Sequence, residues 1–394
     1  MLEKIKKMRK NDYIHLLKII ISFIPGMFLK RIKKDIWIIS ERENDAKDNG
    51  YYLFKYIEEN KLKDDVFYAI NKKSNDYNKI SQFDKNIIKF GSIKHHIYTW
   101  ACNKNISSQV GGGLPNRICY TLQMKNIYKF KSIFLQHGIT QAKPEWLESY
   151  KNKIDLFCCV SPREREFVIK ELGYPEEVVK NIGFCRYDGL ESNKEKKQIL
   201  FMLTWRSNLV SDNKEDYKKY EKIFLESNYY KTIDQYINNE KLINFLEKNN
   251  YEFIVYLHDN MQIYIDLFIP NSKNIIMANK NKYDIQTLMK ESKYLITDYS
   301  SVAFDFAYMK KPLQYFQFDD ENYRKIHYPE GYFKYEKDGF GKITTSIDES
   351  INEIIKMNEN NFEMEEIFQN RVNEFFKYVD KNNCERIYKE ICNI

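Results

Sequence analysis

Two histidines each follow an apolar run of strand-like length, which makes them candidates for acid–base chemistry. His137 comes after residues 132–136, and His258 comes after residues 252–257. Ligand sites in open α/β sheets lie at the carboxyl ends of strands. An imidazole there is a candidate general base because its pKa lies near neutral pH. A histidine after a strand is also often structural, so position alone leaves both interpretations open.

Two adjacent serines indicate an anion site. Ser300 and Ser301 stand between a predicted strand at 294–297 and a predicted helix at 302–309. The first turn of a helix has unpaired N–H groups and a partial positive charge, so it binds anions, and two hydroxyl groups would add donors. The alternative is that one serine only caps the helix.

Two arginines stand where they would reach a phosphate. Arg206 follows the predicted strand 198–204, close to Thr204, and Arg186 follows the predicted strand 180–183. A guanidinium group is a planar fork that binds phosphate oxygens bidentately. For Arg186, a salt bridge to Asp188 is an equally weighted alternative.

The elements that position these residues alternate between strands and helices. Further strands are predicted at 35–40, 66–71, 87–90, 105–108, 156–160, 274–278 and 313–316, and helices at 51–60, 93–103, 162–172, 217–249 and 285–291. This alternation indicates parallel, doubly wound sheets of the α/β class. We expect two domains, 35–190 and 198–345, joined by the polar linker 191–197. Residues 346–394 are predicted to form helices that pack across both.

The N-terminal segment 1–34 carries most of the charge excess. It holds ten Lys or Arg against two acidic residues, a balance of +8, which leaves 53 basic and 54 acidic residues, or −1, in the rest of the chain. A basic excess confined to one segment argues against a nucleic-acid-binding surface. Lys18 and Pro25 interrupt the apolar part, so we expect an amphipathic segment on anionic lipid rather than a membrane-spanning helix or a signal peptide. The alternative is a helix packed on the first domain.

Cysteines, other histidines and glycines give weaker signals. Seven cysteines without a C-x-x-C pair fit a reducing, cytosolic compartment. His95 and His96 are interpreted as a surface pair, and with no metal motif in the sequence we expect no cofactor and leave metal dependence open. The loop 110–115 contains three glycines but is no dinucleotide fingerprint. It permits close approach of a ligand or of another loop, or it is a mobile connector.

Several short strings together resemble one family, the CDP-glycerol glycerophosphotransferases, which include teichoic-acid and capsule polymerases. The strings are Asp298-Tyr299-Ser300-Ser301, Phe304-Asp305-Phe306, Lys311-Pro312, His137-Gly138, Thr204-Trp205-Arg206, His258 and the segment 183–188 with Arg186. The resemblance covers roughly residues 35–345. It implies a GT-B fold, in which two Rossmann-like halves face each other across a cleft and the C-terminal half binds the donor nucleotide.

The resemblance also implies a reaction and roles for the residues. The enzyme would transfer glycerol phosphate or ribitol phosphate from a CDP-polyol to a glycan or polyol-phosphate acceptor, lipid-linked or free, at the cytoplasmic face of the membrane, releasing CMP. His137 and His258 would be catalytic, with His137 the base. The substrate-binding residues would be Arg186, Thr204, Arg206, Asp298, Ser300, Ser301 and Asp305. The alternatives are a GT-B glycosyltransferase that uses a nucleotide sugar and a non-catalytic, membrane-associated nucleotide-binding scaffold.

Overall fold

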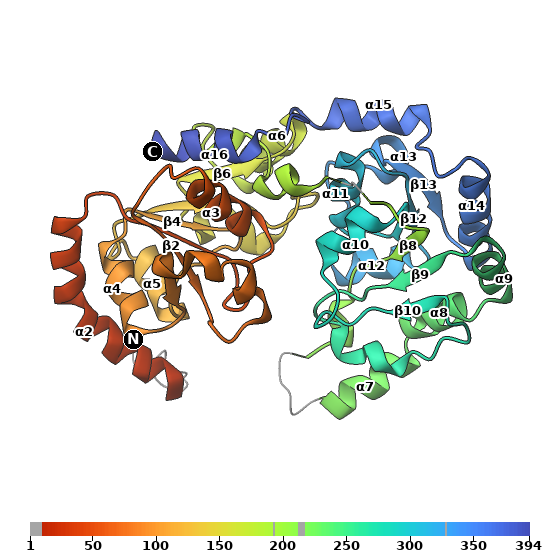
Figure 1. Ribbon diagram of the computed structural model, residues 1–394, viewed down its shortest axis with the longest axis horizontal. Coiled ribbons are helices and arrows are strands. Elements are labelled where there is room, and N and C mark those ends of the chain that lie inside the picture. Colours follow the sequence, from red (N-terminus) through yellow and green to blue (C-terminus); the bar gives the residue numbers. More distant parts are fainter. Residues whose placement is uncertain (1–9, 192–193, 212–216, 328) are drawn as a thin grey trace. The chain divides into compact units, whose positions relative to one another are not determined.

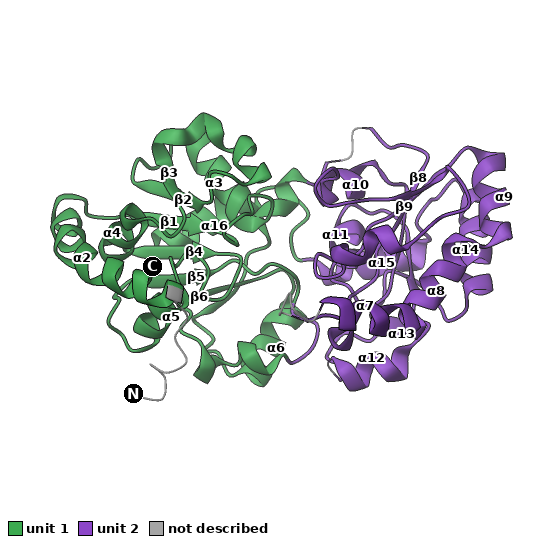
Figure 2. Ribbon diagram, turned by 90° about the horizontal axis from the view of Figure 1, so that it is seen from below, with its two compact units in different colours: residues 1–139, 144–189, 377–394 green, residues 140–143, 190–376 purple. Residues whose placement is uncertain are grey.

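The chain forms two compact units, each built around one parallel sheet (Figures 1 and 2). The computed structural model describes residues 10–191, 194–211, 217–327 and 329–394. Unit 1 comprises Met1–Ile139, Pro144–Gly189 and Lys377–Ile394, and unit 2 comprises Thr140–Lys143 and Leu190–Phe376. The predicted α/β class with two Rossmann-like halves is confirmed. The C-terminal helices divide between the two units.

The sheet of unit 1 has the strand order β3-β2-β1-β4-β5-β6-β7, with every neighbouring pair parallel. Its strands are β1 (Trp37–Ser40), β2 (Val66–Ile70), β3 (Ile87–Lys89), β4 (Lys104–Ser107), β5 (Lys131–Phe134), β6 (Leu156–Cys159) and β7 (Val179–Asn181). Most of their residues are buried, because helices cover both faces of a parallel sheet. The order reverses between β1 and β4, which is where such sheets bind ligands.

The helices of unit 1 are α2 (Lys10–Ile32), α3 (Asn49–Glu59), α4 (Ile93–Ala101), α5 (Arg117–Met124), α6 (Pro162–Leu172) and α16 (Asn383–Cys392). Helix α16 comes from the far end of the chain but is part of this core. Ile387 and Ile391 pack in the same buried cluster as Trp37. The carboxylate of Asp188 accepts hydrogen bonds from the backbone N–H groups of Asn383 and Cys384, at 3.0 and 2.7 Å.

The sheet of unit 2 has the order β10-β9-β8-β11-β12-β13 and is also fully parallel. Its strands are β8 (Gln198–Phe201), β9 (Glu252–Val255), β10 (Ile275–Met277), β11 (Tyr294–Thr297), β12 (Leu313–Phe316) and β13 (Gly341–Thr344). Its helices are α7 (Tyr217–Glu226), α8 (Asn228–Ile237), α9 (Glu240–Asn249), α10 (Ile285–Glu291), α11 (Val302–Tyr308), α12 (Asp320–Ile326), α13 (Tyr335–Asp338), α14 (Ile347–Glu359) and α15 (Glu366–Phe375).

Helix α2 differs from the sequence prediction in one respect. It runs unbroken for 23 residues with Pro25 inside it. Tight packing explains the continuity: a Cβ atom on Gly26 would lie 2.4 Å from Trp100 Cβ, so the glycine lets α2 approach α4 closely. The Trp100 indole N–H donates to the carbonyl oxygen of Ile19 at 3.0 Å. Packing on α4 therefore outweighs the helix-breaking tendency of the proline.

Polar side chains also hold α2 on unit 1. Lys18 Nζ donates to the carbonyl oxygen of Gly91 at 2.7 Å, and the buried carboxylate of Asp12 pairs with Arg117. His15 Nδ1 lies 2.9 Å from His96 Nε2, where one nitrogen donates and the other accepts. This face of α2 is committed to contacts within the unit.

The adjacent histidines His95 and His96 are fully buried, so the prediction of a surface pair was wrong. Gly91 N–H donates to His95 Nδ1 at 3.1 Å, so His95 Nε2 carries the proton and donates to the carbonyl oxygen of Gly113 at 3.0 Å. Burial lowers the pKa of His95 to about 4. Burial, followed by the nearby His95, His15 and Lys18, lowers the pKa of His96 to about 3. Both imidazoles are therefore neutral at pH 7.

Acidification is expected to destabilise unit 1. The folded-state pKa values of His95 and His96 lie near 4 and 3, whereas unfolded histidine has a pKa of about 6.5. The unfolded chain therefore gains protons first, and stability is lost as the pH falls from about 6.5 toward 4. At pH 5 each histidine should cost about 2 kcal/mol. Urea unfolding followed by tryptophan fluorescence between pH 7.5 and 5 measures this loss.

The matched variants are His96→Gln and His137→Gln, because His137 is exposed. Relative to wild type, His96→Gln should flatten the decrease in unfolding free energy between pH 7.5 and 5, whereas His137→Gln should leave that decrease unchanged. Equal pH dependence in all three proteins would contradict the assignment.

Candidate active site

His137 lies just beyond the carboxyl end of β5, as predicted, and its side chain is exposed while the preceding residues 132–136 are buried. A hydrogen bond from a buried side chain fixes its backbone. The guanidinium Nη1 of Arg186 donates to the carbonyl oxygen of His137 at 3.1 Å. The imidazole is therefore presented to solvent on a fixed loop.

Asn49, at the start of α3, ties this loop to two other segments. Its amide Nδ2 donates to the carbonyl oxygens of Leu135 and Gln136 at 3.2 and 2.7 Å, and its Oδ1 accepts from the backbone N–H of Arg186 at 3.0 Å. The Arg186 guanidinium in turn pairs with Asp48 at 3.0 Å. Asp48 and Asn49 thus support the histidine loop.

Arg186 has a different ionic partner from the one considered in the sequence. Its side chain is buried against Asp48, whereas Asp188 accepts hydrogen bonds from α16. Asp48 thus takes the place that the alternative interpretation gave to Asp188. The sequence separation of 138 residues between Asp48 and Arg186 concealed the actual pair.

Gln136 has a left-handed backbone, with φ of 57°, immediately before His137. A non-glycine residue in this region costs about 1–3 kcal/mol and persists only where the surroundings enforce it. Its side-chain amide is enclosed: Nε2 donates to the carbonyl oxygen of Cys158 at 2.6 Å and to Glu164 Oε1 at 3.0 Å. Strain of this kind clusters at functional sites.

In unit 2, His258 lies beyond the carboxyl end of β9 and is partly exposed. Its Nδ1 accepts from the backbone N–H of Asn260 at 3.3 Å. The ring of Trp205 contacts two imidazoles. It is nearly parallel to His258 at 5.9 Å between centroids and edge-on to His327 at 5.4 Å.

His327 and Trp205 were missed as site residues by the sequence analysis. His327 ends α12, far along the chain from β9, and its Nε2 accepts from the backbone N–H of Ser207 at 3.3 Å. Burial, with Arg206 nearby, lowers the pKa of His327. His327 follows a helix and not a strand, so the strand-end rule did not select it. The only sequence signal near it is the presence of aromatic residues.

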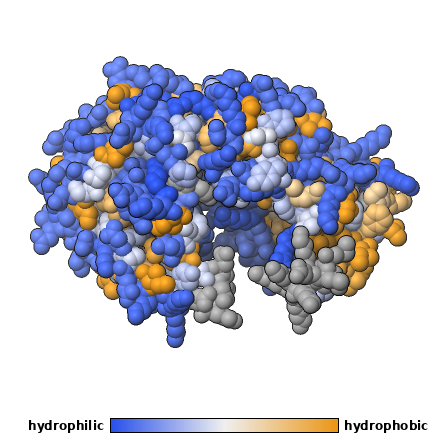
Figure 3. All heavy atoms as spheres, turned by 180° about the vertical axis from the view of Figure 1, so that it is seen from behind, coloured by the Kyte–Doolittle hydropathy of each residue, from blue (hydrophilic) through white to orange (hydrophobic). Residues whose placement is uncertain are grey.

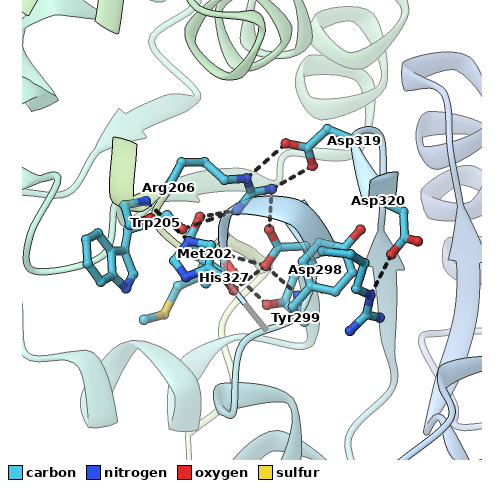
Figure 4. A network of polar contacts seen from close by, with 12 residues as sticks. Met202, Trp205, Arg206, Asp298, Tyr299, Asp319, Asp320 and His327 are labelled. Atoms are coloured by element: carbon cyan, nitrogen blue, oxygen red, sulfur yellow. Dashed lines mark hydrogen bonds and ion pairs between the residues drawn. The ribbon is translucent and has the colours of Figure 1, made fainter. Parts of the chain in front are cut away.

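Arg206 is buried at the centre of a polar network, shown in Figure 4. Its Nε and Nη2 donate to the two oxygens of Asp319 at 2.9 and 2.7 Å, and Nη2 also donates to Asp298 at 3.0 Å. Nη1 donates to the carbonyl oxygen of Thr204 at 2.7 Å. Burial would lower the pKa of Arg206, but the two carboxylates outweigh it and raise the pKa above its ordinary value.

Asp298 and Thr204 belong to the same network. The fully buried Asp298 carboxylate accepts from the backbone N–H and the hydroxyl of Thr204, at 2.7 and 2.6 Å, and from the backbone N–H of Tyr299 at 2.6 Å. Three of the predicted site residues, Thr204, Arg206 and Asp298, therefore contact one another. Arg206 and Asp298 are buried, and Thr204 is half-buried.

Ser300 and Ser301 are partly exposed and lie between the buried residues Tyr299 and Val302. Ser300 Oγ accepts only a long hydrogen bond of 3.4 Å from the backbone N–H of Val302, and Ser301 makes no side-chain capping bond to α11. By contrast, Ser346 forms a full capping box at the start of α14. Helix capping therefore does not account for Ser301.

Two further residues of the family strings are buried. Asp305 lies within α11, and the Lys311 ammonium group donates to the carbonyl oxygens of Lys290 and Ser292, both at 2.7 Å. Lys311 therefore caps the carboxyl end of α10, a structural task. Among the described residues, no group of three or more His, Cys, Asp or Glu side chains is arranged to hold a metal ion.

Two Rossmann-like units, each built around one fully parallel sheet, are characteristic of the GT-B class of folds. Residues 24–393 match the family model described as CDP-Glycerol:Poly(glycerophosphate) glycerophosphotransferase. The chain belongs to this family.

Individual relatives agree with this placement. The chain is 34% identical over 367 residues to the minor teichoic acid biosynthesis protein GgaB of Bacillus subtilis strain 168, covering 92% of this chain and 40% of GgaB. It is 31% identical over 202 residues to the teichoic acid poly(ribitol-phosphate) polymerase of Bacillus spizizenii, covering 50% of this chain and 28% of that protein. The chain thus spans well under half the length of these curated relatives.

Solved structures share the fold. The wall teichoic acid polymerase TagF superposes with a TM-score of 0.66 at 17% identity, over 98% of each chain. A Staphylococcus aureus MnaA structure with UDP superposes with a TM-score of 0.55 at 14% identity, over 92% of this chain and 96% of that chain.

Arg206→Ala is expected to destabilise unit 2 by about 3–5 kcal/mol, because it leaves two buried carboxylates without their counter-charge. Urea unfolding followed by the fluorescence of Trp205, in a background where the other three tryptophans are Phe, would report on this unit.

Arg324→Ala is the matched control. The Arg324 guanidinium also lies over the Tyr299 ring, at 5.0 Å, but it pairs with the largely exposed Asp320. Arg324→Ala should lower the free energy of unfolding by less than about 1 kcal/mol. Similar losses in both variants would show that the Arg206 network contributes no more than a surface pair.

Proposed function

We propose that this protein transfers a polyol phosphate from a CDP-polyol to a polyol-phosphate or glycan acceptor and releases CMP. The observation that carries the proposal is the match of residues 24–393 to the glycerophosphotransferase family. A histidine beyond a sheet edge in each unit supports it. Glycerol phosphate and ribitol phosphate are the candidate groups for transfer.

His137 is the proposed general base. It is exposed at the edge of unit 1 and its loop is fixed by Asn49 and Arg186. In the reaction it removes the proton of the acceptor hydroxyl. That oxygen attacks the β-phosphorus of the donor, an acceptor O–P bond forms, and the bond from phosphorus to the bridging oxygen breaks so that CMP leaves.

Unit 2 is the proposed donor side. Phosphoryl transfer depends chiefly on stabilising the charge that spreads over the phosphate oxygens. Ser301 has a hydroxyl group that caps no helix, Ser300 lies beside it, and both stand at the start of α11. These hydroxyls and His258 are the groups we assign to the pyrophosphate.

Arg206 acts indirectly in this proposal. Its donors are directed to Asp298, Asp319 and backbone oxygens, so it fixes the segments that carry the serines instead of binding phosphate itself. Thr204 and Asp298 share this positioning role. Arg186 plays the same part for His137, and Asp305 remains assigned to substrate binding.

We also propose that α2 holds the enzyme peripherally on the cytoplasmic face of the membrane. Its outer side is strongly apolar and lies along the right-hand edge of the molecule in Figure 3. The exposed residues include Ile14, Leu17, Ile20, Ile21, Ile24, Phe28 and Ile32. Residues Asn11–Ile32 are long and apolar enough to cross a membrane. The buried polar contacts of Asp12 and His15 favour a helix lying in the membrane plane instead.

The central test of the function uses the two histidines. His137→Ala should lower the single-turnover rate by about 10²–10⁴-fold with donor affinity nearly intact. His258→Ala should weaken both donor binding and turnover, because a phosphate ligand acts in the ground state and in the transition state. CMP release from CDP-glycerol, CDP-ribitol and a panel of nucleotide sugars measures the activity, and calorimetry measures donor affinity.

Melting temperature is the control for both variants, and His327→Gln tests whether any imidazole near Trp205 has the same effect as His258. A wild-type rate in His137→Ala would overturn the mechanism. Release of nucleotide only from nucleotide sugars would replace it with glycosyl transfer, and no release from any donor would favour a scaffold.

The membrane proposal is tested with two isoleucines of equal exposure, Ile24 on α2 and Ile269 in unit 2, both 76% exposed. Ile24→Asp should lower binding to anionic vesicles about tenfold or more, because it removes apolar area from the docked face and adds a negative charge. Ile269→Asp should bind like wild type, and high salt should weaken wild-type binding. Equal flotation of both variants with vesicles would remove α2 from the proposal.

A further inference from the structure

A cavity of about 600 Å³ opens at the carboxyl edge of the sheet of unit 1. It is lined by residues that follow β1, β3 and β4, and by the first turns of α2. Strands β1 and β4 flank the point where the strand order reverses, the usual ligand position in an open α/β sheet. Its volume falls in the range of small-molecule sites. None of the functional residues described above lines it.

The wall formed by α2 is fixed in place. Asn11 and His15 line the cavity from this helix. Between them, the buried Asp12 carboxylate accepts hydrogen bonds from Arg117, and His15 bonds to the buried His96. The cavity is therefore closed on this side by the same helix whose outer face is apolar.

The loop 110–115 forms another wall of the cavity and packs closely on β4. Gly113 has φ of 78°, and a Cβ atom there would lie 2.3 Å from Asn105 Oδ1. A Cβ atom on Gly112 would lie 2.1 Å from Ser107 Oγ. Asn105 Nδ2 also donates to the carbonyl oxygen of Gly112 at 2.8 Å. The glycines thus allow the loop to pack closely on β4, in line with the alternative that they permit close approach.

Glu41, which also lines the cavity, indicates that the cavity is not a dinucleotide site of the Rossmann type. The Glu41 carboxylate accepts from the backbone N–H groups of Lys47, Asp48 and Tyr51, at 2.9, 2.9 and 2.7 Å. These groups belong to the start of α3, where a dinucleotide fold binds phosphate. The chain places the Glu41 side chain at that position, where burial and the neighbouring Asp48 raise the pKa of its carboxyl group to about 8.

The remaining lining combines two kinds of group. Arg42 supplies positive charge, and the Arg117 side chain, although paired with Asp12, is 58% exposed. Glu43, Gln109 and Asn116 supply hydrogen-bonding groups for hydroxyls. A ligand that matches both has anionic phosphodiesters separated by several hydroxyl groups. A guanidinium fork suits the phosphodiester, and carboxylate and amide oxygens accept from the hydroxyls.

We infer that this cavity binds the polyol-phosphate acceptor, in the segment next to the unit that reacts. The inference rests on the proposed transferase function for the identity of the ligand. Strand β4 pairs directly with β5, so the loop after β4 lies one strand from the loop that carries His137. Neighbouring strands lie about 4.8 Å apart, so an acceptor chain in the cavity can extend its terminal hydroxyl toward that imidazole.

The test is direct binding without a donor. Calorimetry measures the affinity of the full chain for two defined probes, a glycerol phosphate trimer and a ribitol phosphate trimer, with inorganic phosphate as a third titrant. At least one trimer should bind. Arg42→Ala should weaken that binding about tenfold or more, and Gln109→Leu should weaken it by a smaller factor. Both variants should keep the wild-type melting temperature.

Lys129→Ala is the matched control, since Lys129 is an exposed cation just before β5, at the opposite edge of the same sheet. It should bind the trimer like wild type. Failure of both trimers to bind, unchanged affinity in Arg42→Ala, or equally tight binding of inorganic phosphate would overturn the inference. The binding experiment contains no CDP-polyol, so it is independent of the CMP-release experiment. Absence of CMP release would contradict the proposed function without affecting the measured affinity for the trimer.

Discussion

The buried ion pairs of Arg206 are the constraint on which unit 2 depends. A guanidinium that is 1% exposed must have every donor directed to an acceptor, because an unpaired buried charge would cost several kcal/mol. Its partners follow three different strands, β8, β11 and β12. The network therefore fixes three loops relative to one another. Ser300 and Ser301 come directly after Asp298 and Tyr299, so their position follows from this network.

In unit 1, the side-chain amide of Asn49 fixes the loop that carries the functional residue. Asn49 and Arg186 together bind the backbone oxygens of residues 135–137, and this support holds Gln136 in a left-handed conformation. Both units thus place a functional side chain by fixing the backbone that carries it. In each unit the buried polar residues act on the chain itself, and the exposed neighbours are left for chemistry.

Much of the fold could be predicted from the sequence, because strands of a parallel sheet are short, continuous apolar runs. Strand β13 was missed, since its residues Gly341–Thr344 lack such a run, and α5 was missed between two loops. The segment 217–249 was predicted as long helices and forms three, which pack in the core of unit 2. In the candidate site, the motifs placed His137, His258 and the serines at strand ends. They could not reveal that Arg206 is saturated or that His327 lies beside Trp205, because those contacts join segments more than 100 residues apart.

The position of α16 has a consequence for how the protein is made. Unit 1 begins with the first strands of the chain, yet its core is closed by Ile387 and Ile391, and a Cβ atom on Gly183 would collide with Asn383. During synthesis the ribosome releases this helix only after unit 2. The sheet of unit 1 must therefore wait, with part of its apolar surface uncovered, until the whole of unit 2 has been translated. A shortened chain that stops after unit 2 would lack the piece that finishes the half made first.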